Sequence, residues 1–122
     1  MKNVKYGKCV RCGRTYEAKP DLTNCECGGI LDIVYDYVYI KSVLTKEKLA
    51  RRKTRSMGRY RELLPVEETT PDTPLRVGWS PLYEEPNLAR LLGLRKLWIK
   101  DDGQNPTASL KDRASAMAEA KA

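Results

Sequence analysis

The first half of the chain alternates apolar and polar positions over short distances. Residues 15–17 (TYE) and 30–37 (ILDIVYDY) show a period of two, which predicts short strands. Residues 44–55 (LTKEKLARRKTR) can form a helix capped by Thr45, although its apolar face is narrow. Residues 56–77 contain Gly58 and three prolines, and this composition predicts an extended crossing segment.

The last third of the chain changes to helical spacing. GWSPLY at 78–83 predicts a turn, and Pro86 suits the first turn of a helix. The leucines at 88, 91 and 92 share one face of that helix, and Gly93 stands where a helix C-cap is expected. Residues 97–99 (LWI) then predict a strand.

A second helix is predicted at the end of the chain. Ser109 and Asp112 are spaced as a capping box, so we place the helix start at Ser109. Its apolar stripe would consist of Ala114, Met117 and Ala118, small enough to pack closely on a sheet. Helix, strand, loop and helix in this order predict the beginning of an α/β domain, which 122 residues leave incomplete.

The charge of the chain is unevenly distributed. The 122 residues include 23 Lys+Arg, 16 Asp+Glu and no His, for a net charge of +7. The basic segment, residues 41–61, holds nine Lys and Arg against Glu47 alone. Such a block can bind nucleic-acid phosphates, although charge runs more often form a solvated face. No apolar run approaches the roughly 18 residues of a membrane span, and the start lacks a signal-peptide core, so we expect a cytoplasmic protein.

Two close cysteine pairs, CVRCG at 9–13 and CECGG at 25–29, mark a candidate metal site. Thiolates bind Zn²⁺ in a tetrahedron at about 2.3 Å, and two short-spaced pairs on facing loops close such a site. Because the chain has no His, the predicted ligands are Cys9, Cys12, Cys25 and Cys27, a set that makes the zinc structural. Two disulfides are the alternative, disfavoured in the cytoplasm, and a redox CxxC is another, although one pair here is CxC.

Lys111 lies in NPTASLKDR, residues 105–113, within the first turn of the predicted final helix. The partial positive charge of a helix start disfavours an ammonium there and favours the neutral amine that attacks an aldehyde. The other interpretation of these residues alone is a solvated surface lysine.

NPTASLKDR resembles the pyridoxal-phosphate (PLP) lysine motif of fold type II enzymes, whose threonine synthase version reads close to NPTGSFKDR. Three further stretches are similar to zinc-ribbon threonine synthases, in the same order: the CxxCG…CxCGG ribbon, GRYRELLPV and GWSPLYEEPNLARLLGLRKLWIKDDGQNP. Ala108 and Leu110 depart from the Gly and Phe usual in the motif, and Ser80 stands where Thr is commoner. The resemblance implies a four-cysteine zinc ribbon at 1–40, a basic helix and extended connector at 41–77, and the beginning of a PLP-binding α/β domain at 78–122.

The same resemblance implies a lyase that converts O-phosphohomoserine and water to threonine and phosphate. Lys111 would hold PLP covalently and transfer protons, Asn105 and Ser109 would shape the cofactor pocket, and Ser80 would face the substrate. The family's Asn-containing loop and its Gly-rich phosphate loop do not occur in these 122 residues. We therefore expect the isolated chain to bind PLP weakly and to lack turnover.

Two other functions stay open at this point. One is another fold type II enzyme, threonine dehydratase-like or cysteate synthase-like. The other is a zinc-ribbon nucleic-acid-binding module, which would leave residues 78–122 without a purpose and offers only Tyr60 for base stacking within the basic segment. We expect a phosphorylated amino acid as the partner, with neither nucleic acid nor membrane, and an intact protein that is compatible with a homo-oligomer.

Overall fold

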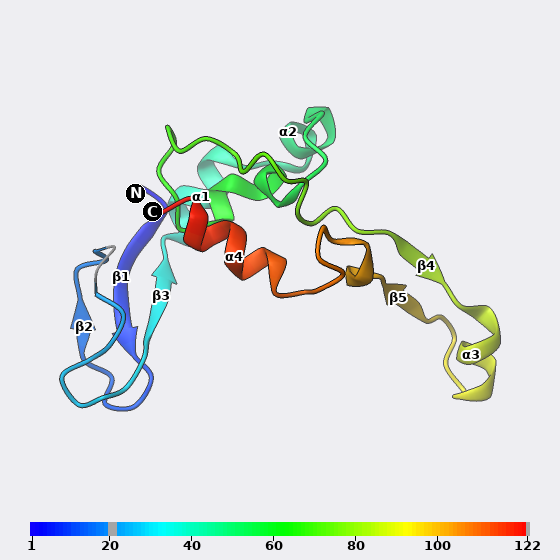
Figure 1. The fold of residues 1–122 in the computed structure, drawn as a ribbon, viewed down its shortest axis with the longest axis horizontal. Helices are drawn as coiled ribbons and strands as arrows, with labels where there is room; N and C mark the ends of the chain where they lie inside the picture. The colour runs from blue at the N-terminus through cyan, green and yellow to red at the C-terminus, as the bar shows by residue number, and fades with distance from the viewer. Residues whose placement is uncertain (20–21, 122) are drawn as a thin grey trace.

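The computed structural model describes residues 1–19 and 22–121 and mixes short strands with short helices (Figure 1). None of the helices in the described residues is long and apolar enough to cross a membrane. The elements in chain order are β1 (Val4–Cys9), β2 (Thr15–Tyr16), β3 (Leu31–Tyr35), α1 (Tyr37–Val43), α2 (Lys46–Arg51), the 3₁₀ helix η1 (Met57–Leu63), β4 (Leu82–Glu84), α3 (Pro86–Leu91), β5 (Trp98–Lys100), the 3₁₀ helix η2 (Asp102–Gln104) and α4 (Asp112–Glu119).

The first three strands form an antiparallel sheet in the order β2-β1-β3. The two predicted strands are confirmed as β2 and β3, while the central strand β1 was not predicted. Its register places Gly7 opposite both Tyr16 and Ile33. A Cβ at Gly7 would lie 3.7 Å from the Leu31 side chain, an ordinary van der Waals distance, so Leu31 packs directly over this position of the strand. The sheet thus holds the loops that carry the cysteines.

Helix α1 begins where the predicted strand 30–37 was expected to continue. The Asp36 carboxylate accepts hydrogen bonds from the backbone N–H groups of Val38 and Tyr39, both at 3.0 Å. This N-cap ends the strand at Tyr35 and starts a helix that buries Ile40. The prediction of strand through residue 37 is therefore wrong by two residues, because a capping aspartate follows the alternating run.

The connector contains two short helices instead of one helix and an extended run. The predicted Thr45 cap is confirmed, since its hydroxyl accepts from the N–H of Lys48 at 3.2 Å. Helix α2 ends at Arg51, earlier than the predicted 44–55. The segment 56–77 is not extended throughout, because η1 begins after Ser56, whose hydroxyl accepts from the N–H of Gly58 at 3.2 Å.

Strands β4 and β5 pair antiparallel and project with α3 as an arm away from the first sheet (Figure 1). Pro86 opens α3 and Gly93 follows its end at φ +66°, as the sequence predicts. The strand at 97–99 is confirmed as β5, whereas β4 occupies part of the predicted turn. The predicted leucine face is exposed, with Leu91 82% accessible, because α3 buries only Ala89.

The last helix lies across the middle of the molecule and buries a different face from the one predicted (Figure 1). Ala116 is 3% exposed and Met117 is half-buried, whereas Ala114 and Ala118 are exposed. The predicted stripe is wrong at two of its three positions, because the connector and not a sheet lies against this helix: Ala116 and Met117 border the same cavity as Met57, Val66 and Pro71.

Candidate functional site

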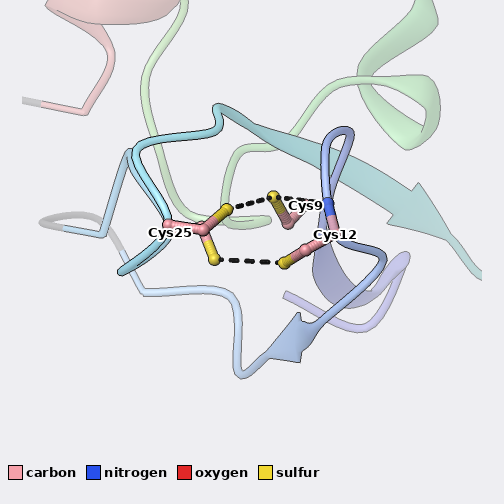
Figure 2. A group of neighbouring side chains, drawn as sticks. Cys9, Cys12 and Cys25 are labelled. Atoms are coloured by element: carbon pink, nitrogen blue, oxygen red, sulfur yellow. Dashed lines mark hydrogen bonds between the residues drawn. The ribbon is translucent and has the colours of Figure 1, made fainter.

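Four cysteine side chains, from the end of β1, the loop after it and the loop before β3, converge on one point. Figure 2 labels three of them, Cys9, Cys12 and Cys25. The four sulfur atoms all lie within 4.8 Å of one another. The Sγ atoms of Cys9 and Cys27 are 3.6 Å apart, as are those of Cys12 and Cys25. A tetrahedron with Zn–S bonds of about 2.3 Å has edges of about 3.8 Å, so the spacing fits a zinc centre with four thiolate ligands. It is far longer than the roughly 2.05 Å of a disulfide bond, and all four cysteines are free.

Polar groups around the cluster orient the sulfurs. The backbone N–H groups of Arg11 and Cys12 point at the Cys9 sulfur at 3.4 and 3.5 Å. The Tyr16 hydroxyl lies 3.1 Å from the Cys25 sulfur, a contact that was not predicted from the sequence. The only sequence signal for it is that Tyr16 lies in a strand beside the first cysteine pair. Such contacts hold thiolate ligands in position and are typical of structural metal sites.

A tight turn brings the second cysteine pair to the first. Gly28 adopts φ +77°, which glycine reaches without strain. A Cβ at Gly29 would lie 2.6 Å from the Cys9 sulfur, so no larger residue fits there without displacing a ligand. The two glycines of this turn are therefore required, Gly28 for its dihedral angle and Gly29 for space.

Hydrogen bonds within the cluster shift the pKa values of three of its thiols in different directions. The backbone N–H of Cys27, followed by the Tyr16 hydroxyl, lowers the pKa of Cys25 to about 6. The backbone N–H of Cys12 lowers the pKa of Cys9. The N–H of Gly29 lowers the pKa of Cys27, but the neighbouring sulfurs outweigh it and raise the pKa to about 12. A metal ion bound by the four sulfurs would displace the protons that they carry.

The lysine turn, residues 105–113, has a different form from the predicted capping box. Helix α4 begins at Asp112, and Lys111 is its N-cap residue. The Ser109 hydroxyl accepts from the N–H of Lys111 at 3.1 Å and does not reach Asp112. The Asp112 carboxylate instead accepts from the N–H of Thr107 at 2.8 Å and from its hydroxyl. The helix start at Ser109 was therefore wrong by three residues, because Asp112 closes the turn that precedes the helix.

The predicted substrate residue Ser80 lies in an internal polar network. Its side chain is 7% exposed, and its hydroxyl donates to the Asp102 carboxylate. Arg113 donates to both oxygens of Asp102, at 2.8 and 3.1 Å, and lies 3.3 Å from the Ser80 hydroxyl. The Lys100 ammonium donates to the Ser80 carbonyl. The network joins the turn at Ser80, Pro81 and Leu82, here called the SPL turn, to helix α4. Asp102 was not predicted from the sequence, where an acidic pair just after a strand was its only signal.

Asn105 fixes the start of the lysine turn against the same region. Its side chain is 5% exposed, and its Oδ1 accepts from the N–H of Gly78 at 2.9 Å. Its Nδ2 donates to the carbonyl of Asp102 at 2.9 Å. Both ends of the amide thus bond to the backbone, so Asn105 positions the turn, and the second N–H of its Nδ2 is not used by these two bonds.

Together these contacts divide the predicted site residues into two groups. Ser80 and Asn105 are buried and meet through Asp102. Ser109 and Lys111 share the lysine turn, where Ser109 is half-buried and the Lys111 side chain is exposed. The amine of Lys111 is therefore accessible to a ligand, and the buried pair holds the loops that flank it.

Ala108 lies within the lysine turn at φ +55°, in the left-handed region. A residue with a Cβ is strained there by about 1–2 kcal/mol, part of which glycine recovers. We expect Ala108→Gly to stabilise the chain by roughly 0.5–1 kcal/mol, measured by urea unfolding. Ala114→Gly, at an exposed position inside α4, is the matched control and should destabilise by about 1 kcal/mol. Equal effects of the two substitutions would contradict this account of the turn.

The Asp102–Arg113 pair predicts a dependence of stability on acid. The Arg113 guanidinium, with the Ser80 hydroxyl, lowers the pKa of Asp102 from 3.8 to about 2. A lowered pKa in the folded state stabilises the chain above pH 3.8, and this contribution disappears as the pH falls towards 2. The difference in unfolding free energy between the chain and Arg113→Gln should therefore be constant from about pH 7 to 5 and shrink below about pH 4. If this difference in unfolding free energy stays constant down to about pH 2.5, the Asp102–Arg113 pair is not its source.

Three arginines of the basic segment point inward. Arg52 donates to the Glu62 carboxylate at 2.8 Å, and Arg61 donates to Asp72 at 2.6 Å. Arg59 donates to the carbonyl of Arg52 at 2.6 Å. These side chains hold parts of the connector together, so three of the arginines in the basic segment have a structural role. A weak affinity for single-stranded DNA or RNA at about 150 mM salt stays the prediction, and tight binding with a steep salt dependence would contradict it.

The proteins that this chain resembles are amino-acid synthases. It is 43% identical over 106 residues to a threonine synthase of Methanocaldococcus jannaschii and 40% identical over 116 residues to one of Methanosarcina acetivorans. These matches cover 87% and 94% of the chain but only 26% and 27% of the relatives. A cysteate synthase of Methanosarcina acetivorans is more distant, 35% identical over 101 residues, with 81% of the chain and 21% of the relative covered.

The predicted resemblance to threonine synthases is therefore confirmed over most of the chain. The chain spans about a quarter of the length of the relatives that it matches. No family model and no solved structure matches it.

Proposed function

We infer that the chain is part of a PLP-dependent threonine synthase-like enzyme that converts O-phosphohomoserine and water to threonine and phosphate. The observation that carries this inference is the 40–43% identity to two threonine synthases. With 94% of the chain aligned, only a few residues at its ends fall outside the match, so the lysine turn lies within it.

The residues of the lysine turn fit the cofactor. Lys111 presents an exposed primary amine, the group that reacts with an aldehyde, and Ser109 adds a hydroxyl on the same turn. When bound, PLP supplies the electron sink that stabilises carbanions formed next to the amino group of a substrate. The part of Lys111 is to hold the cofactor and, once released from it, to take up and return protons at its Nζ.

The other predicted site residues position this turn. Asn105 holds its start through both ends of its amide, and Ser80 holds the SPL turn through Asp102. We assign Asn105 to positioning and not to direct contact with the cofactor. Ser80, whose hydroxyl donates to Asp102 and whose carbonyl accepts from Lys100, would position the turn that faces a substrate.

A chimera tests the proposed function. In it, the aligned residues of this chain replace the matching segment of the Methanosarcina acetivorans threonine synthase, a match that covers 94% of the chain. We expect the chimera to release phosphate from O-phosphohomoserine with stoichiometric formation of threonine, and to need added PLP. A folded chimera that binds PLP but forms no threonine would contradict the assignment.

The similarity to cysteate synthase supports a second candidate of the same class. Its lower identity, 35% against 43%, places it behind threonine synthase. The same chimeric approach, with the Methanosarcina acetivorans cysteate synthase as host, distinguishes the two. We expect the chain to support threonine formation in the first host and to reduce cysteate formation in the second, and the reverse result would favour the second candidate.

A further inference from the structure

An open cavity of about 460 Å³ lies against the SPL turn, outside the lysine turn. Tyr60 and Trp79 contribute aromatic walls, and Arg76 and Lys100 contribute cations. The remaining lining comes from residues 80–82 (Ser-Pro-Leu). Among the described residues no Asp or Glu lines the cavity, so its fixed charge is positive.

The two cations differ in how they are held. The Lys100 ammonium is fixed at the wall because it donates to the carbonyl of Ser80. Arg76 is exposed, and within residues 1–19 and 22–121 its guanidinium forms neither a hydrogen bond nor an ion pair. An ammonium and an uncommitted guanidinium on one wall are the donors that proteins use for phosphate groups.

Neighbouring groups strengthen the positive field. The guanidinium carbon of Arg59 lies 4.7 Å from the centre of the Trp79 ring and adds a third cation behind the wall. The nearest acid in the network, Asp102, is paired with Arg113 through two hydrogen bonds at 2.8 and 3.1 Å. The charge of Asp102 is thereby compensated within the network.

Trp79 itself is held in an unusual backbone conformation. It adopts φ +55°, between the left-handed Gly78 at φ +79° and the buried Ser80. A large residue at positive φ is strained, and such strain is concentrated where a side chain must be presented in a particular direction. Here the indole is presented to the cavity that the two cations line.

We propose that this cavity binds a phosphate monoester, with Arg76 and Lys100 as its charged donors. A phosphate carries a charge of about −1.5 to −2 near neutral pH, which two cations match. The proposal rests on the proposed function only for the source of the phosphate, either a phosphorylated amino acid or the phosphate of PLP. It adds a phosphate-binding site and a specificity-determining arginine to the residues expected from the sequence.

The test uses the zinc-loaded 122-residue chain with Trp98→Phe, which leaves Trp79 as the sole tryptophan. Its fluorescence is followed at about 150 mM salt during titration with inorganic phosphate and with O-phosphohomoserine, and homoserine is the control without phosphate. We expect saturable binding of both phosphates and none of homoserine. Arg76→Gln should weaken binding about tenfold or more, since a charged hydrogen bond to the anion is lost. Arg76→Lys should keep part of the affinity.

Arg95→Gln is the matched control, because Arg95 is an exposed arginine in the loop before β5 and does not line the cavity. It should leave binding unchanged. Equal losses in Arg76→Gln and Arg95→Gln, or no saturable phosphate binding, would overturn the proposal. Backbone amide NMR spectra of the variants establish that each is folded.

A parallel titration with PLP, followed by amide shifts around residues 76–82, identifies the source. Tighter binding of O-phosphohomoserine assigns the cavity to the substrate, and tighter binding of PLP assigns it to the cofactor. Because these titrations measure binding and not turnover, the proposed reaction can fail in the chimera while the phosphate site stands. Conversely, an active chimera with no effect of Arg76→Gln on the KM for O-phosphohomoserine or on PLP affinity would overturn the site alone.

Discussion

We predict that the four-cysteine cluster binds one zinc ion and that removal of this ion unfolds the sheet of β1, β2 and β3, the largest change in stability expected for this chain. Within the described part of residues 1–35, the buried apolar side chains are those of Cys9 and Cys25, so the cluster takes the place of a core. Structural zinc contributes about 10 kcal/mol or more in zinc-finger peptides, which is as large as the whole stability of a typical domain. Chelation should collapse the amide NMR dispersion of residues 4–35 while one zinc per chain is released.

Single substitutions distinguish the contribution of a zinc ligand from that of a residue that only contacts a ligand. Cys12 is exposed, so Cys12→Ser removes a ligand with little loss of packing and should abolish stoichiometric zinc binding. Tyr16→Phe keeps all four ligands and removes the hydroxyl that lies 3.1 Å from the Cys25 sulfur, so it should weaken zinc binding by about tenfold. A metal-free chain that keeps its native ribbon spectrum, or one whose cysteines form two disulfides, would refute the zinc assignment.

Replacement of Lys111 is expected to abolish the reaction of the chimera. Lys111→Ala removes both the amine that would hold PLP and the proton carrier, so the rate should fall by about a thousandfold or more. The rate of Lys111→Arg should fall as far as that of Lys111→Ala, because a guanidinium keeps the positive charge but does not become a neutral nucleophile. The measurement is threonine formation at saturating O-phosphohomoserine and PLP.

The control for this experiment is Lys53→Ala, which removes an exposed lysine of the connector. It should leave the rate within about twofold, as expected for a solvated side chain. If Lys111→Arg were as active as the unsubstituted chimera, the lysine would contribute only charge, and its catalytic assignment would be wrong.

The pattern of the sequence predicted the elements whose signals are local. Thr45 and Pro86 mark helix starts, Gly93 follows a helix end, and residues 97–99 alternate, so each is found from neighbouring positions alone. Strand β1 was missed because Gly7 interrupts its alternation, and its partners are supplied by strands distant in the sequence. The fate of the predicted leucine face also depends on distant contacts, and Leu91 has none that bury it.

The candidate site was predictable where spacing alone defines the chemistry. The four cysteines were found from two short pairs, and the structure brings their sulfurs together as expected. The network of Ser80, Asp102 and Arg113 was not found, because it joins three segments and each residue taken alone has an ordinary local explanation. Asp112 was predicted to form a capping box with Ser109, but its carboxylate accepts from the N–H of Thr107 instead. The left-handed conformation of Ala108 lies between Thr107 and the helix, and this turn was not predicted from the sequence.

The most direct test of the central claim is the position of the reduced PLP adduct in the chimera. After borohydride treatment, trypsin cannot cleave at a pyridoxyl-lysine, so modification of Lys111 should yield the uncleaved peptide of residues 101–113, DDGQNPTASLKDR, carrying one pyridoxyl group. We expect that peptide to be the main adduct and to be absent in Lys111→Arg. An adduct on another lysine of the chain, or none on a chimera that forms threonine, would contradict it.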